Sequence, residues 1–143
     1  MGSRRLTPAG LGIEGVNLKT DTNYTSKVLD VREAFVYTVI IDVTETGSPG
    51  NGAFSLTIRC TDRDGNTTYE LDAVTAIDSQ TNGSQTVFTW GSGNPATLHG
   101  SGTIADNVDI LKVFDYMEIE LDVTTANDGT TSTADVTLLL EEV

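Results

Sequence analysis

The sequence is poor in the residues that build most catalytic and metal sites. It contains one cysteine, Cys60, and one histidine, His99. A lone cysteine excludes an intrachain disulfide and a CxxC motif, and the two residues supply too few ligands for a usual transition-metal site. The chain also lacks a phosphate-binding loop and a dinucleotide fingerprint. This inventory argues against an enzyme, and we expect no cofactor.

Basic residues are scarce as well. Lys and Arg number 8 against 21 Asp and Glu, which gives a net charge of -13. A nucleic-acid-binding protein needs a net basic face, so we expect no nucleic-acid partner. No apolar run approaches the roughly 18 residues of a membrane-spanning helix, so we expect no membrane partner. The first residues, Met1–Arg5, are not followed by the apolar segment of a signal peptide.

The acidic residues are unevenly spread along the chain. Residues 1–63 hold seven bases and seven acids, whereas residues 64–143 hold fourteen acids and a single base, Lys112. One interpretation is that a neutral region meets a partner while an acidic region stays solvated. The alternative is that strands simply carry Asp and Glu on their solvent-facing sides.

β-branched residues are abundant. Thr, Val and Ile together make up 44 of the 143 residues. Such side chains are stiff at χ1 and suit pleated sheets, and the length is that of one ordinary domain. The composition therefore predicts a single all-β domain.

Alternating apolar residues separated by turn chemistry support this prediction. Residues 34–43 are the most apolar segment and are expected to form a central strand, while 53–60 and 67–77 flank an Asp-Gly turn that predicts a hairpin. Cys60 ends an alternating run and is expected to be buried. The predicted strands are 24–29, 34–43, 53–60, 67–77, 84–90, 97–104, 111–123 and 131–141, with one helical turn near 106–111.

Seven or eight antiparallel strands, each with one solvent-facing side, predict two sheets packed face to face. Eight strands fit a jelly roll and seven fit an immunoglobulin-like sandwich. The predicted fold is an all-β, antiparallel two-sheet β-sandwich formed by residues 23–143, with an extended N-terminal arm at 1–22.

The arm is predicted because residues 1–22 show neither strand nor helix periodicity. It is slightly basic in an acidic protein, and an ordered arm must bury apolar side chains on whatever surface it binds. The candidate partner-binding residues of the arm are Arg4, Arg5, Leu6, Leu11, Ile13, Val16, Leu18 and Lys19.

Two acidic patterns are candidate sites. Asp62, Asp64 and Asn66 have the spacing that opens a calcium loop, but Thr67 and Ala73 stand where an EF-hand needs Gly and Glu, so a hairpin turn is favoured over a weak calcium site. The row Glu118, Glu120 and Asp122 has a spacing that a glycosidase could use. A solvent-facing strand side gives the same row, and Trp90 is the only strong candidate for a sugar platform.

The order of strands and turns resembles that of capsid decoration (cement) and other accessory head proteins of tailed bacteriophages. The resemblance covers residues 24–141 and holds no diagnostic motif, so no functional residue is carried over. The segments that carry it are Val28–Val31, Ala34–Thr44, Gly47–Gly50, Ser55–Ile58, the Asp64-Gly65 turn, Gly83–Phe88, Asp115–Leu121 and Ala134–Leu138.

This resemblance implies a virion structural protein, made in the host cytoplasm, that binds the major capsid protein on the outer capsid surface as a homotrimer. The alternatives are a carbohydrate- or receptor-binding β-sandwich module, which predicts exposed aromatic residues around Trp90 and a calcium site, and a tail or baseplate component, which predicts a ring.

Overall fold

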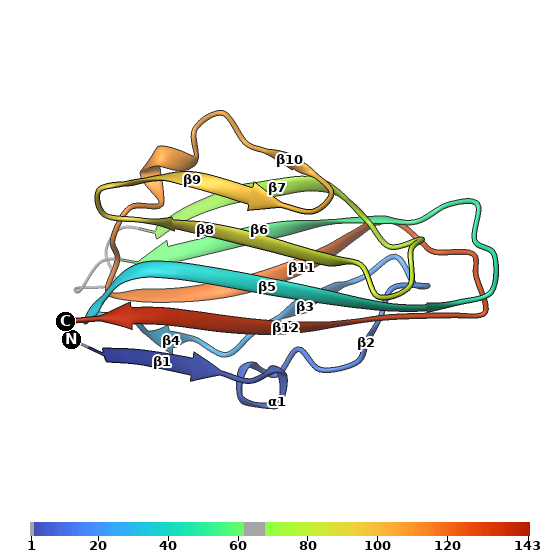
Figure 1. Cartoon of the computed structure of the whole chain (residues 1–143), viewed down its shortest axis with the longest axis horizontal. Coiled ribbons are helices and arrows are strands. Elements are labelled where there is room, and N and C mark those ends of the chain that lie inside the picture. The colour runs from blue at the N-terminus through green and yellow to red at the C-terminus, as the bar shows by residue number, and fades with distance from the viewer. Residues whose placement is uncertain (1, 62–67) are drawn as a thin grey trace.

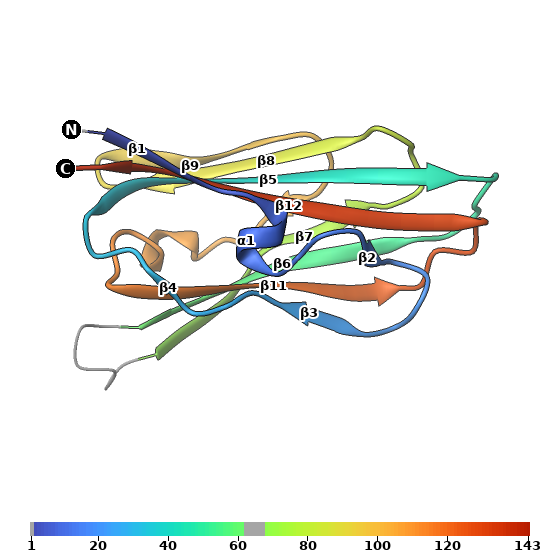
Figure 2. The same cartoon turned by 90° about the horizontal axis from the view of Figure 1, so that it is seen from below.

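Two antiparallel six-stranded sheets pack face to face in the computed structural model, which describes residues 2–61 and 68–143 (Figures 1 and 2). The predicted all-β sandwich is therefore confirmed. One sheet, sheet A, has the order β1-β12-β5-β8-β9, with β2 also paired to β12. The other, sheet B, has the order β10-β7-β6-β11-β3, with β4 also paired to β11.

The elements follow the predicted segments closely, apart from the N-terminal region. The short 3-10 helix η1 confirms the predicted helical turn, and the predicted strand at 24–29 is two short strands. The elements are β1 (Gly2–Leu6), α1 (Pro8–Leu11), β2 (Val16–Asn17), β3 (Asn23–Thr25), β4 (Leu29–Asp30), β5 (Ala34–Thr46), β6 (Ala53–Thr61), β7 (Thr68–Asp78), β8 (Gln85–Gly91), β9 (Asn94–His99), β10 (Thr103–Ile104), η1 (Val108–Ile110), β11 (Tyr116–Thr125) and β12 (Thr131–Glu142).

The strand β5 is central in sheet A, as predicted, because β12 and β8 pair on either side of it. The predicted hairpin of β6 and β7 also forms, with Thr61 opposite Thr68. Alternation places one side of each strand in a continuous core between the sheets. Cys60 lies in this core at 1% exposure, which confirms its predicted burial. Burial raises the pKa of the Cys60 thiol to about 12.

The N-terminal region is not an arm that reaches outward. Strand β1 pairs with β12 along its whole length, and β2 pairs with β12 further along. Between them α1 lies at the open side of the sandwich, between the two sheets (Figure 2). The hydroxyl of Thr7 caps this short helix by accepting a hydrogen bond from the Gly10 amide.

The prediction that Leu11, Ile13 and Leu18 bind a partner is therefore wrong. All three are at most 1% exposed and belong to the chain's own core. Leu6 and Val16 are partly buried against the same core. Because these apolar residues sit in short segments with different pairings, no single periodicity links them, and the sequence pattern could not show that they are buried.

Candidate binding surface at the end that holds the termini

Both termini lie at one end of the sandwich, because Gly2 of β1 pairs with Glu142 of β12 (Figure 1). We call this the terminal end. The beginnings of β5, β7 and β11 and the end of β6 lie there too, as their pairing registers require. The opposite end, called the distal end, holds the loops that follow β5, β7 and β11.

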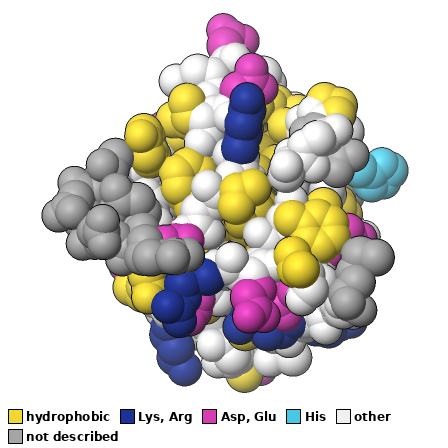
Figure 3. Space-filling model, turned by 90° about the vertical axis from the view of Figure 1, so that its left-hand side faces the viewer, with side chains coloured by type: hydrophobic (Ala, Val, Ile, Leu, Met, Phe, Trp, Pro, Cys, Tyr) yellow, Lys and Arg dark blue, Asp and Glu magenta, His cyan; other side chains and the backbone are white. Residues whose placement is uncertain are grey.

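The large apolar side chains that are exposed in the described part of the chain all belong to the terminal end. Val28 borders a hollow with Thr61, Thr68 and Met117, and Tyr69 stands opposite Cys60 near the end of β6. Figure 3, which views this end, shows apolar side chains gathered on it. The members of this apolar patch are Val28, Tyr69, Ile110, Val113 and Val143, exposed by 63%, 39%, 40%, 48% and 86%.

Part of the patch is held in place by an aromatic contact. The Tyr69 ring lies 5.4 Å from the Phe114 ring at a tilt of 52°. With Ile110 and Lys112 these rings border one shallow depression. The segment from Ile110 to Phe114 leads from η1 towards β11 without pairing to a strand. Leu111 is buried in the core, whereas Ile110 and Val113 are left exposed. Isolated exposed apolar residues are common on proteins, but their concentration at one end makes that end the candidate contact surface.

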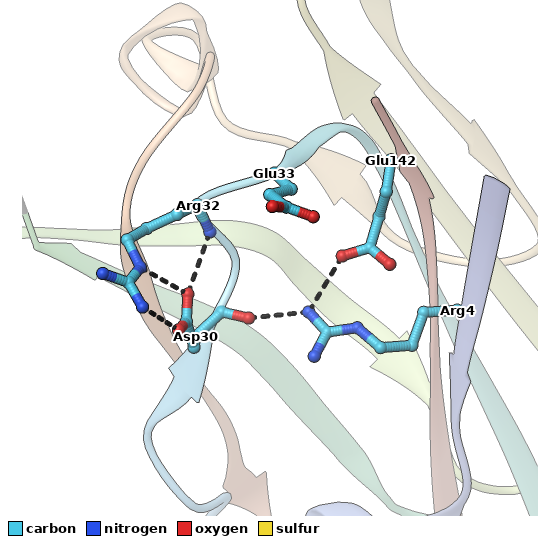
Figure 4. A pocket seen from close by; sticks show the side chains of 5 residues that line it. All are labelled: Arg4, Asp30, Arg32, Glu33 and Glu142. Atoms are coloured by element: carbon cyan, nitrogen blue, oxygen red, sulfur yellow. Dashed lines mark hydrogen bonds and ion pairs between the residues drawn. The ribbon is translucent and has the colours of Figure 1, made fainter. Parts of the chain in front are cut away.

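A second hollow at the terminal end is lined by charged residues from three elements (Figure 4). It has a volume of about 500 Å³ and is bordered by Arg4, Asp30, Arg32, Glu33 and Glu142. The Arg4 guanidinium donates a hydrogen bond of 2.6 Å to the carbonyl oxygen of Asp30 and lies 3.3 Å from the Glu142 carboxylate. Arg4 thereby links β1 and β12 of sheet A to β4 of sheet B.

The neighbouring pair in this hollow is a forked ion pair. Arg32 donates two side-chain hydrogen bonds to the Asp30 carboxylate, at 3.0 and 2.6 Å, and its backbone amide donates a third. These bonds lower the pKa of Asp30 to about 2. The guanidinium also lies 5.6 Å from the centre of the Tyr116 ring. The charges of Asp30 and Arg32 thus largely neutralise one another on the surface.

Acids and bases are mixed at the terminal end, whereas the distal end holds few bases. The terminal half of the molecule carries the bases Arg4, Arg5, Arg32, Arg59 and Lys112, and it also carries the acids Asp30, Glu33, Glu70, Asp109, Asp115, Glu118, Glu141 and Glu142. Basic and apolar side chains share this end in Figure 3. The distal half carries the acids Asp42, Glu45, Asp78, Asp122, Asp128 and Asp135, together with Lys19.

The outer face of sheet B is acidic and organised around one arginine. Arg59 of β6 donates to Glu120 and to Glu70, each at 2.9 Å, and these contacts hold the pKa of Glu120 below its usual range. Asp122 lies two residues along β11, and its pKa is raised by partial burial and by the nearby charges of Glu120 and Asp72. The row Glu118, Glu120 and Asp122 therefore lies on the outer side of β11, away from the core, with Glu120 largely buried in an ion pair.

Trp90 is not an exposed platform. It is 2% exposed, and its ring stacks on Tyr37 with centroids 4.9 Å apart and planes 9° apart. Its indole ring therefore contributes to the core between the sheets and offers no face for a sugar to stack on. The calcium candidates Asp62, Asp64 and Asn66 lie outside the described residues.

Other features of the described residues concern membranes and metals. Residues 2–61 and 68–143 contain no helix long and apolar enough to cross a bilayer. In the same ranges no three Asp, Glu, His or Cys side chains are grouped as metal ligands.

Of the basic residues predicted for partner binding, Arg5 is exposed on β1, whereas Arg4 contacts Asp30 and Glu142. Lys19 donates to the carbonyl oxygens of Gly129 and Thr130.

The apolar patch was missed in the sequence because its members are far apart in the chain. Only one local signal existed, the consecutive apolar residues around Lys112, which break the alternation expected of a strand. The pairing of β4, β6, β7 and β11 is what brings Val28 and Tyr69 to the same end as Ile110 and Val113.

Comparisons with known protein families and with curated proteins find no match. Among solved structures, the VP2 subviral particle of infectious bursal disease virus is 13% identical, with a TM-score of 0.49, over 97% of this chain and 32% of that one. The chain thus spans about a third of the VP2 chain. The CBM36-1 domain of a xylanase from the Trinervitermes trinervoides hindgut metagenome is 13% identical over 99% and 98% of the two chains, with a TM-score of 0.38.

A third similar structure is the SPBc2 prophage-derived protein YomS, 12% identical over 98% of this chain and 94% of that one, with a TM-score of 0.36. At such identities and scores a likeness carries no function from one protein to another. The terminal end and the resemblance in strand and turn order are therefore the features that bear on function.

Proposed function

We propose that the chain is a non-enzymatic structural protein of a virion, which binds the outer surface of a phage capsid and stabilises it, as decoration or cement proteins do. The observation that supports this proposal best is the gathering of the exposed large apolar side chains at the terminal end. A protein whose role is attachment needs such a contact surface on a rigid body, and it needs no catalytic groups.

The terminal end is the surface we assign to the major capsid protein. Its apolar patch would supply burial on binding, while Arg5, Lys112 and the Arg32–Asp30 ion pair would supply a polar rim with charges of both signs. The acidic distal end would then point away from the shell, and the acidic outer face of sheet B would point sideways. Repulsion between these surfaces would keep decorated particles apart.

The oligomeric state in this proposal is a homotrimer. A three-fold arrangement lets each copy present the same terminal end to the shell, because rotation about an axis normal to the capsid leaves that end facing it. Light scattering on the purified protein tests this: the expected mass is three times the 15.2 kDa of the chain. A ring of higher copy number would instead favour a tail or baseplate component.

Location and binding are tested together with virions of the source phage. Particles separated into heads and tails on a density gradient are expected to hold the protein in the head fraction, exposed to antibody on intact particles. Recombinant protein is also expected to co-sediment with heads from which the native protein has been removed. Recovery in tails alone, or absence from gradient-purified virions, would overturn the proposal.

A further inference from the structure

The distal end contains a buried carboxylate without a hydrogen-bond partner. Glu45, near the end of β5, is 4% exposed, and neither Oε1 nor Oε2 has a partner within the described protein. Its side chain faces inward, in line with Val43 and opposite Ser132 of β12. An ionised carboxylate held out of water without a compensating partner is strongly unfavourable.

Several other oxygen atoms converge on the same place. They surround Gly129. A Cβ atom placed on Gly129 would lie closest to Oε1 of Glu45, 2.9 Å from the Thr46 carbonyl oxygen and 3.0 Å from Oδ1 of Asn127. Of these, Oδ1 of Asn127 accepts one hydrogen bond from the Gly129 amide, and the Thr46 carbonyl accepts one from Thr130. An oxygen of this type retains a second lone pair for another ligand.

The surrounding side chains hold these oxygens in place. Asn127, 2% exposed, donates through its amide nitrogen to the carbonyl oxygen of Ser79 at 2.8 Å. The Ser132 hydroxyl donates to the same carbonyl at 3.3 Å. The backbone amide of Glu45 donates to Oδ1 of Asn82 at 3.0 Å. The loops after β5, β7, and β11 therefore meet in one ordered, oxygen-rich cluster.

Lys19, the basic residue at this end of the sandwich, does not neutralise Glu45. The Lys19 ammonium donates to the carbonyl oxygens of Gly129 and Thr130, and it forms no ion pair with Glu45. The nearby acid, Asp128, is likewise occupied, since its carboxylate accepts hydrogen bonds from the amides of Gly50 and Asn51. Glu45 is thus the one of these charged groups that lacks a partner among the described residues.

We propose that Glu45, the Thr46 carbonyl and Asn127 bind a hard divalent cation, and that calcium is the ion. Every donor here is an oxygen, which disfavours zinc and suits calcium, and calcium tolerates a mixed set of carboxylate, amide, carbonyl and water ligands. With a single carboxylate the affinity falls in the weak range, with a Kd of about 10⁻⁴ to 10⁻³ M. This site lies at the end of the sandwich opposite to the proposed capsid contact and does not depend on it.

Thermal unfolding of the full-length protein, freed of metal with EDTA, tests the site. Adding 10 mM CaCl2 at constant ionic strength is expected to raise the unfolding midpoint by about 3–11 °C, with a smaller rise for MgCl2. Glu45→Gln keeps the size of the side chain and is expected to fold but to lose the calcium response. Asp42→Asn, which removes an exposed acid from the outer side of the same strand, is expected to respond like the unaltered protein.

Titration calorimetry with CaCl2 supplies the second measurement. The unaltered protein is expected to bind one calcium per chain and the Glu45→Gln variant none. An unaltered protein that shows neither a shift in midpoint nor a binding isotherm would overturn the proposal. A Glu45→Gln variant with the calcium response of the unaltered protein would overturn it equally.

Discussion

The guanidinium of Arg4 donates a 2.6 Å hydrogen bond to the backbone carbonyl oxygen of Asp30, and so joins the first strand of sheet A to sheet B (Figure 4). The same side chain pairs with Glu142 at the other end of the sequence. Three segments that are far apart in the chain therefore meet at one arginine, at the end of the sandwich that holds both termini.

Removing this link should loosen β1 without unfolding the protein. We expect Arg4→Ala to lower the free energy of unfolding by about 1 kcal/mol, since the bonds are partly exposed to water. Hydrogen exchange of the β1 amides should become faster, while exchange in the centre of β5 should not change. Arg5→Ala, on the next residue and exposed, is the matched control and should alter neither quantity.

Residues of the N-terminal region should matter for folding of the chain itself. Because Leu11 is fully buried, Leu11→Ala should lower the free energy of unfolding by about 2–5 kcal/mol. Val28→Ala, at a residue that is 63% exposed, should change it by less than about 0.5 kcal/mol. Urea unfolding followed by Trp90 fluorescence measures both, and equal midpoints for the two variants would contradict the docking of this region on its own core.

The Arg59–Glu120 pair predicts a dependence of stability on pH. The folded protein holds the pKa of Glu120 below its usual value of 4.5, so the pair stabilises the fold above that value and ceases to do so as the pH falls through the folded pKa. Glu120→Gln should therefore cost about 1–3 kcal/mol at pH 7 and progressively less below about pH 4.5.

The control for this pH series is Glu118→Gln, on the same side of β11. Arg59 forms its ion pairs with Glu120 and Glu70, so this change should cost little at either pH. If the Glu120→Gln deficit were the same at pH 7 and pH 3, the assignment of its stabilising effect to the charged pair would be contradicted.

Cys60 should be unreactive in the folded protein. Its burial in β6 raises the pKa of the thiol to about 12, so the nucleophilic thiolate is scarce at pH 8 and shielded from reagents. Labelling with a thiol reagent should be slow in buffer and rapid in denaturant. Rapid labelling of the native protein would show that sheet B opens around Cys60.

Much of the fold was predictable because alternation within a strand is a local property. The run from Phe54 to Cys60 places its apolar side chains on one side whatever the rest of the chain does, and the Asp-Gly turn after it limits the partner strand to the segment that follows. The residue range of β12 was predicted for the same reason. The strands that pair with β12 could not be predicted, because neither segment alone shows which distant strand it pairs with.

The binding surface was far less predictable than the fold. The sequence pattern assigns Leu11 and Ile13 to a partner, since isolated apolar residues in a segment without periodicity look alike whether they bind another protein or their own core. Trp90 is a candidate sugar platform in the sequence because a sequence does not show which aromatic ring will stack on Tyr37. The gathering of Val28 with Ile110 depends on the pairing of whole strands, and only the structure reveals it.

The capsid contact is tested most directly by measuring occupancy on heads stripped of the native protein, as copies bound per head after co-sedimentation. We predict that the double variant Ile110→Ser and Val113→Ser, with both changes at exposed positions of the patch, folds normally yet binds at least about tenfold more weakly. The control Thr44→Ala, exposed near the distal end of β5, should bind like the unaltered protein. Full occupancy by the double variant would contradict the assignment of the terminal end to the capsid.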